Sequence, residues 1–196
     1  MRFAGQPLGA LLLLLASGHS MLANRFDIVE GNPVSPVKVL IYEDLQCGDC
    51  DTLRHLLDDR LLPRYGSRVA FVHRDFPLGK HEWAHAAAVA ARWVSQQNPA
   101  AGIEFRREIL AERNNITPQT LKLWLGEFAA RNHLDSKAIV DALEDARLNA
   151  LVDQDRQGAE ARGVRSTPTV YVGGLSFIET IVYEDVARAL DQALGK

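Results

Sequence analysis

The feature that most constrains this chain is the motif Cys47-Gly48-Asp49-Cys50, which contains its only two cysteines. The run directly before it, residues 37–42 (VKVLIY), is β-branched and nearly all apolar. Such a run is typical of a strand buried on both faces. Directly after the motif, leucines recur at helical spacing up to Pro63, where we expect the helix to stop. The cysteines are therefore predicted to lie where a strand ends and a helix begins.

This position favours thiol chemistry. The first turn of a helix has unpaired backbone N–H groups and a partial positive charge, and both stabilise a thiolate. We expect Cys47 to be the exposed, activated sulfur. Cys50, one turn further into the helix, is well placed to attack a mixed disulfide formed on Cys47 and release the partner.

Two cysteines at this spacing also occur as half of a zinc site or as a buried structural pair. Zinc sites normally need a second pair of ligands, and no other cysteine exists. The nearest histidine pair, His81 and His85, lies about 30 residues downstream, beyond the roughly 12 to 15 residues of a zinc finger. The spacing favours redox chemistry and leaves the other two interpretations open.

Composition bounds the class of protein. The chain has 196 residues, of which 47% are hydrophobic and 24% charged, and this is enough to form a globular domain with a sizeable core. Its net charge is −3, and its basic residues are dispersed, so we predict no nucleic-acid partner. Acidic residues are concentrated around the cysteines: Glu43, Asp44, Asp49 and Asp51.

The amino terminus resembles a secretory signal peptide over residues 1–23. Arg2 precedes an apolar run at residues 8–16, and small residues follow, with cleavage expected after Gly18, Ser20 or Ala23. The apolar run is too short to span a bilayer. We therefore expect a periplasmic or secreted protein, or a cytoplasmic one if translation starts at Met21. The absence of other cysteines suits an oxidising compartment.

The rest of the chain alternates between strand and helix signals. We expect an edge strand near residues 26–29 and a strand at residues 69–76, which would pair in parallel with residues 37–42 through a right-handed crossover. Residues 82–163 read as helical throughout, with a helix start at Thr117-Pro118, another cap at Asp135 or Ser136, and an end at Gly163. A hairpin at residues 169–177 and a helix at residues 183–194 follow.

Three stretches carry a family resemblance: residues 44–50 (DLQCGDC), 74–78 (RDFPL) and 163–169 (GVRSTPT). In this order and spacing the chain resembles the DsbA-like family of thiol:disulfide oxidoreductases. The resemblance implies an α/β protein with a thioredoxin-like fold and an inserted helical subdomain. Residues 24–81 and 164–196 would form the thioredoxin-like domain, and residues 82–163 the inserted helical subdomain.

The resemblance also implies roles. Cys47 matches the nucleophile, Cys50 the resolving cysteine, and Thr167-Pro168 the family's X-cis-Pro, where the backbone of Thr167 would pair with an extended substrate. The implied function is disulfide exchange with protein thiols, as an oxidase of exported proteins or, with reversed electron flow, a reductase or isomerase. No cofactor is implied beyond the Cys47–Cys50 disulfide, and a membrane or soluble redox partner would recycle it. The oligomeric state is left open.

The chain departs from the family near the cysteines. Relatives often have an acid six residues before the nucleophile as proton acceptor for the resolving cysteine, whereas this chain has Ile41. Unless Glu43 or Asp44 substitutes for it, the proton of Cys50 must leave through water.

Gly48 and Asp49 stand where the strongest oxidants of the family have Pro-His. A histidinium would stabilise the thiolate of Cys47, whereas Asp49 repels it. We therefore predict a Cys47 pKa of roughly 5 to 7.5, above that of DsbA at about 3.5. The reduction potential should lie between those of DsbA and thioredoxin, about −120 and −270 mV.

A second motif, His81-Glu82-Trp83-Ala84-His85, has the H-E-x-x-H pattern of zinc peptidases, with Glu104 or Glu108 as a third ligand. It begins at a helix entrance after Pro77-Leu78-Gly79-Lys80, which favours a polar helix start over a metal site. A third hypothesis is a non-catalytic module that keeps only a peptide groove. A zinc peptidase would lose activity on chelation, and the non-catalytic module would have a disulfide that never cycles.

Overall fold

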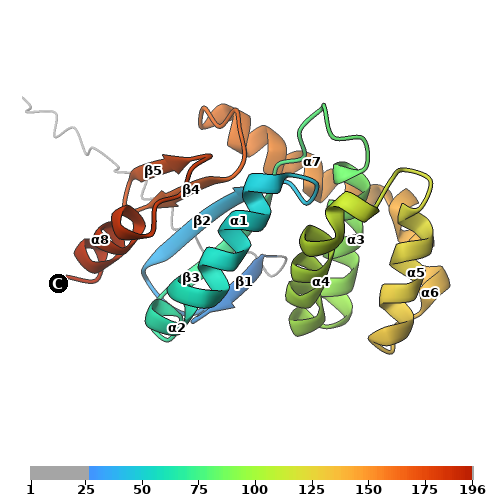
Figure 1. Ribbon diagram of the computed structural model, residues 1–196, viewed down its shortest axis with the longest axis horizontal. Coiled ribbons are helices and arrows are strands. Elements are labelled where there is room, and N and C mark those ends of the chain that lie inside the picture. Colours follow the sequence, from blue (N-terminus) through green and yellow to red (C-terminus); the bar gives the residue numbers. More distant parts are fainter. Residues whose placement is uncertain (1–26, 196) are drawn as a thin grey trace, which may run out of the picture.

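The computed structural model describes residues 27–195, which contain a five-stranded mixed sheet flanked by helices (Figure 1). Its strands are β1 (Ile28–Gly31), β2 (Lys38–Glu43), β3 (Ala70–Asp75), β4 (Thr169–Val172) and β5 (Leu175–Ile178). They lie in the order β1-β3-β2-β4-β5, with β2 parallel to β3 and the other pairs antiparallel. The predicted parallel crossover is confirmed.

Most of the helices lie between β3 and β4 in sequence. The helical segments are α1 (Gly48–Leu56), the π-helical η1 (Leu57–Leu61), α2 (Leu62–Tyr65), α3 (Ala84–Gln97), α4 (Pro99–Glu112), η2 (Arg113–Asn115), α5 (Leu121–Arg131), α6 (Ser136–Asp141), η3 (Ala142–Glu144), α7 (Ala146–Ala161) and α8 (Tyr183–Ala193). Helices α3 to α6 form a block beside the sheet (Figure 1). This is the helical block that the sequence predicts.

Strand β2 is buried on both faces, as its apolar run predicts. Val39 and Ile41 pack with Leu53 of α1 and with α8 on one face. Leu40 and Tyr42 face the other side, where α7 contributes Ala159. Burial on both faces holds the carboxyl end of β2, and therefore the cysteine motif that follows it, in a fixed position.

Pro63 does not stop the first helix, so that prediction is wrong. In a regular α-helix its ring would clash with the carbonyl four residues earlier. Here a π-helical turn precedes it, in which Leu62 N donates to Leu57 O. Pro63 then falls in the first turn of α2, where its missing N–H is not needed.

The helix expected to start at Thr117-Pro118 begins regularly only at Leu121. The capping interaction is nevertheless present. Thr117 Oγ1 accepts a hydrogen bond from Thr120 N at 3.2 Å, and Thr120 Oγ1 accepts one from Thr117 N at 2.9 Å. These two hydrogen bonds hold an irregular turn that delays the helix by three residues.

The expectations for the carboxyl-terminal part are confirmed. Asp135 caps α6, and Gly163 follows α7 with a φ of +83°. The β4–β5 hairpin turns at Gly173 and Gly174, both with positive φ. The predicted signal peptide lies outside the described residues. Within residues 27–195, no helix combines the length and apolar character needed to cross a bilayer.

Buried ion pairs fasten the helical block to the sheet. Arg106 of α4 is fully buried; its Nη1 donates to Glu43 Oε1 at 2.8 Å and its Nη2 to Asp75 Oδ1 at 2.5 Å. These acids stand opposite one another at the ends of β2 and β3. Arg92 of α3 adds a second cation, with Nε 2.5 Å from Asp75 Oδ2, and also pairs with Asp155 of α7.

Replacing Arg106 by methionine should destabilise the protein by about 3 to 5 kcal/mol, because it leaves two buried carboxylates without their shared cation. Urea unfolding of the variant and the wild type measures this difference. Arg131→Met is the matched control, since Arg131 pairs with Glu108 at the surface and should cost at most about 1 kcal/mol. Equal losses in both variants would contradict the importance of the buried pairs.

Candidate active site

The two cysteines lie at the start of α1, as predicted. Cys47 is the N-cap residue, with φ −84° and ψ 129°, and Cys50 lies in the first turn. Both are free thiols. Cys47 is 8% exposed and Cys50 fully buried. Cys47 is therefore the more accessible sulfur but less exposed than expected, because the helical block packs over both.

The structure brings Thr167, the residue before Pro168, against Cys47 from 120 residues away. The Thr167-Pro168 peptide bond is cis, as the resemblance implies. Cys47 Sγ lies 3.4 Å from Thr167 O, within hydrogen-bonding distance for a thiol. Thr167 itself is buried and lies two residues before β4. One edge of the Cys47 sulfur is thus lined by backbone.

The environment separates the two sulfurs chemically. The pKa of Cys47 is lowered to about 5, and the largest contribution is a hydrogen bond from the Cys50 thiol. Burial opposes this shift, whereas Thr167 and the amides of Cys50 and Asp49 add to it. Burial raises the pKa of Cys50 well above its ordinary value, and the charges of Cys47 and Glu43 raise it further. At neutral pH the arrangement holds a thiolate at Cys47 and a thiol at Cys50.

Asp44 organises the loop before the cysteines. Its backbone N lies 3.4 Å from Cys50 Sγ. Its buried carboxylate accepts hydrogen bonds from Gln46 N and Leu78 N, both at 2.7 Å, and lies 2.8 Å from His81 Nδ1. The contact with Leu78 joins two of the three stretches that carry the family resemblance. Asp44 therefore has its hydrogen-bonding capacity committed to the backbone and to His81.

The carboxylate of Glu43 is paired with two cationic side chains. Its Oε1 lies 2.7 Å from His73 Nδ1 and 2.8 Å from Arg106 Nη1. Burial alone would raise the pKa of Glu43, but the charges of His73 and Arg106 hold that pKa below its ordinary value. Correspondingly, the carboxylates of Glu43 and Glu30 raise the pKa of the fully buried His73 against the effect of burial. Glu43 is thus an ionised carboxylate and a weak base.

Arg113 is a cation beside the motif that the sequence patterns did not reveal. Its Nη1 donates to Asp51 Oδ2 at 2.6 Å and to Leu110 O at 2.8 Å. Its Nη2 lies 3.7 Å from where a Cβ on Gly48 would be. Asp49, by contrast, is exposed. No local pattern marks Arg113, because it reaches Asp51 across 62 residues.

The burial of Arg106 also has a signal in the sequence. It lies three residues after Ile103 and three before Ile109, on the apolar face of a helix. Charged residues at such positions are rarely buried without a partner. The pattern therefore supports the expectation that Arg106 pairs with a buried negative charge on the sheet.

The H-E-x-x-H residues do not converge. His81 precedes α3, which begins at Ala84, and its Nδ1 contacts Asp44. His85 Nε2 lies 3.4 Å from Asp153 Oδ1 instead. The glutamates considered as third ligands pair with arginines: Glu104 with Arg107 and Glu108 with Arg131. Across residues 27–195, no three His, Cys, Asp or Glu side chains are grouped so as to hold a metal ion.

Comparison with known sequences gives a family and partial relatives. A family model described as thioredoxin matches residues 23–192. The Na⁺/H⁺ antiporter NhaA 1 of Salinispora arenicola is 32% identical over 174 residues, which are 86% of this chain and 25% of that protein. NhaA 3 of Salinispora tropica is 32% identical over 149 residues, 76% of this chain and 22% of that protein. The chain spans about a quarter of the length of these curated relatives.

Solved structures share the architecture at low sequence identity. BdbD from Bacillus subtilis superposes with a TM-score of 0.76 at 17% identity, covering 87% of this chain and 94% of its own. Wolbachia pipientis α-DsbA1 superposes with a TM-score of 0.76 at 17% identity, covering 89% of this chain and 94% of its own. A thioredoxin-like oxidoreductase from Silicibacter pomeroyi superposes with a TM-score of 0.74 at 21% identity, covering 92% of this chain and 99% of its own. The chain therefore belongs to the thioredoxin family and has the thioredoxin-like fold with a helical insertion found in DsbA-like thiol-disulfide oxidoreductases.

Proposed function

We propose that this protein exchanges disulfides with the thiols of other proteins through Cys47 and Cys50, as a DsbA-like oxidase of exported proteins. The observation that carries the proposal is the contrast between the two sulfurs. Cys47, at the helix start and against Thr167, has its pKa lowered to about 5, while that of the buried Cys50 is raised. A stable thiolate at Cys47 is a good leaving group, and this favours release of oxidised substrate.

In the proposed reaction a substrate thiolate attacks Sγ of Cys47 in the Cys47–Cys50 disulfide. The bond between the two enzyme sulfurs breaks, and Cys50 leaves with the electron pair and takes up a proton. A second substrate thiolate then attacks the substrate sulfur of the mixed disulfide, and Cys47 leaves as a thiolate. The substrate is oxidised by two electrons and the enzyme is reduced by two. Reverse flow would make the protein a reductase or isomerase.

The surrounding residues take supporting roles in this proposal. The backbone of Thr167, held by the cis bond to Pro168, pairs with an extended substrate segment. Glu43 acts as a fixed negative charge that keeps Cys50 protonated. Because Glu43 is a weak base and Asp44 is committed to other hydrogen bonds, the proton of Cys50 exchanges with water.

Gly48 and Asp49 tune the potential from between the cysteines. Gly48 leaves the side of the motif open to the Arg113 guanidinium, which offsets the negative charge of Asp51 but is not paired with Asp49. Their combined effect is to favour the Cys47 thiolate less than the histidine of the strongest oxidants does.

The organisation of the chain follows from the same proposal. Residues 24–81 and 164–196 form the thioredoxin-like domain, and residues 82–163 form the inserted helical subdomain. The chain acts in the periplasm or outside the cell, where a membrane or soluble redox partner reoxidises it. It requires no cofactor beyond its own disulfide.

Cys47→Ser should abolish oxidation of a reduced, unfolded protein substrate, because no mixed disulfide can form. Cys50→Ala should instead accumulate mixed disulfides when it is mixed with a protein that already contains a disulfide. The Cys47 thiolate attacks that disulfide and expels one substrate thiol, and no second enzyme thiol is present to resolve the product. Turnover assays and non-reducing gels with mass spectrometry measure the two outcomes. Unchanged turnover in Cys47→Ser would refute the assignment of Cys47 as the nucleophile. Cys50→Ala is the control, because it also lacks the disulfide but keeps Cys47.

Titration of the reduced protein should show Cys47 ionising at about pH 5, and Cys50→Ala should raise that midpoint because the largest stabilising hydrogen bond is lost. Since folding lowers this pKa, the thiolate stabilises the reduced fold above the unfolded-state pKa of about 8.5, and the stabilisation is lost as the pH falls through 5. Alkylation rates against pH measure the midpoints. A wild-type midpoint at about pH 8.5 would contradict the stabilisation of the Cys47 thiolate by Cys50. The same holds if Cys50→Ala has the same midpoint as the wild type.

A further inference from the structure

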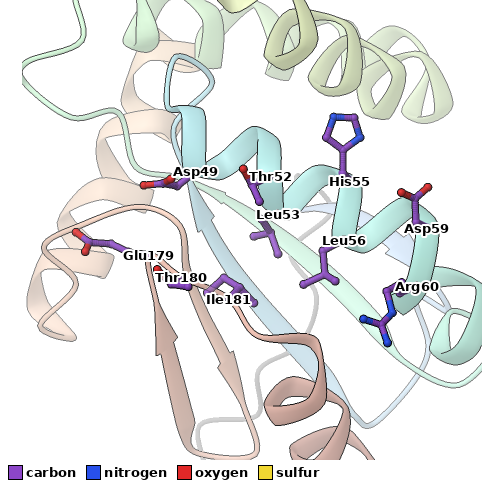
Figure 2. A pocket seen from close by; sticks show the side chains of 10 residues that line it. All are labelled: Asp49, Thr52, Leu53, His55, Leu56, Asp59, Arg60, Glu179, Thr180 and Ile181. Atoms are coloured by element: carbon purple, nitrogen blue, oxygen red, sulfur yellow. The ribbon is translucent and has the colours of Figure 1, made fainter.

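A groove of about 360 Å³ runs along α1 beside the cysteine motif (Figure 2). One wall is α1 and η1, and the other is the segment that follows β5. Its apolar side chains are Leu53, Leu56 and Ile181, and Figure 2 shows them between the two walls. Asp49 and Glu179 lie at the end where α1 begins.

That end of the groove adjoins the reactive sulfur by two routes. Asp49 is two residues from Cys47 on α1. On the other wall, Glu179 N donates to Pro168 O at 2.8 Å, next to the Thr167 carbonyl that contacts Cys47 Sγ. The end of the groove nearest Cys47 is therefore flanked by two carboxylates, one on each wall.

The groove has uncompensated negative charge. Asp49, Asp59 and Glu179 are exposed, and among residues 27–195 none of their carboxylates takes part in an ion pair or a side-chain hydrogen bond. The arginine that lines the groove, Arg60, is already neutralised. Its Nη2 lies 3.3 Å from Glu184 Oε1, and its guanidinium lies 3.5 Å from the centre of the Tyr183 ring.

A cavity after β3 shows the opposite situation. It measures about 310 Å³ and is lined by Phe76 to Gly79 together with the end of α7. Its arginines are satisfied, because Arg156 pairs with Glu160 at 3.3 Å and Arg165 donates to the carbonyls of Glu160 and Val164. The one carboxylate among the described residues that line this cavity, Glu160, is paired, so unpaired carboxylates distinguish the α1 groove from it.

On the basis of the disulfide exchange proposed above, we propose that the α1 groove binds a basic segment of the substrate protein, with Lys or Arg next to the reacting cysteine. The carboxylates of Asp49 and Glu179 attract these cations, and the apolar floor takes the aliphatic parts of their side chains. A cation there also favours the thiolate of the substrate cysteine, which is its reactive form. The preferred substrates are thus unfolded proteins with basic residues around cysteine.

The test uses three dithiol peptides of one sequence whose cysteines are flanked by lysines, serines or glutamates. Rates of their oxidation by the oxidised protein are divided by their rates with the uncharged disulfide of 2-mercaptoethanol, which removes differences in intrinsic thiol reactivity. At low ionic strength the lysine peptide should react about fivefold faster than the serine peptide, and the glutamate peptide slower. The preference should shrink as salt is raised.

Charge-removing variants locate the effect. Glu179→Gln keeps the size of the side chain and lies outside the motif, and it should lower the ratio of the lysine-peptide rate to the serine-peptide rate. Asp59→Asn, further along the groove, should lower the preference less. Glu127→Gln on the exposed face of α5 is the matched control and should leave the preference intact.

Two results would overturn the inference: equal normalised rates for the three peptides, or a lysine preference that Glu179→Gln and Glu127→Gln leave equally intact. Failure of the underlying function looks different. In that case the protein would oxidise none of the three peptides, including the serine peptide.

Discussion

Arg106 connects the parts of this protein that the reaction depends on. Strands β2 and β3 run in parallel and end side by side with Glu43 and Asp75, two carboxylates that would repel each other in a dry interior. The guanidinium between them comes from α4 of the helical block. This shared cation fixes the carboxyl end of β2, from which the cysteine motif follows, and sets the helical block against it.

That placement accounts for the difference between the two cysteines. The core of the helical block, which includes Trp83, Phe105 and Trp124, packs together with Cys47 and Cys50. It buries Cys50 fully beside the charge of Glu43, and both effects favour the protonated thiol. Cys47 accepts a hydrogen bond from the Cys50 thiol and lies at the helix start, where the amides of Cys50 and Asp49 lower its pKa further. One short motif therefore holds two sulfurs of opposite protonation.

Local patterns in the sequence were enough to predict the strands, the crossover and the cysteine pair at the strand-to-helix junction, because each depends on neighbouring residues. The prediction that Pro63 stops the first helix is wrong because a π-helical turn depends on packing that no local pattern reveals. Arg113 and the groove residue Glu179 approach the motif from distant parts of the chain, so only the fold places them there. Burial of Arg106 was marked by its position on an apolar helix face, but its partners, Glu43 and Asp75, lie 63 and 31 residues away in sequence.

The proposed function requires above all that Cys47 and Cys50 form a reversible redox couple. Its most direct test is the equilibrium of the two thiols against glutathione buffers, followed by thiol trapping, with metal analysis of the same sample. We predict a two-electron couple with a potential between about −120 and −270 mV and no stoichiometric metal. A pair that does not cycle, or one zinc bound per chain, would contradict it.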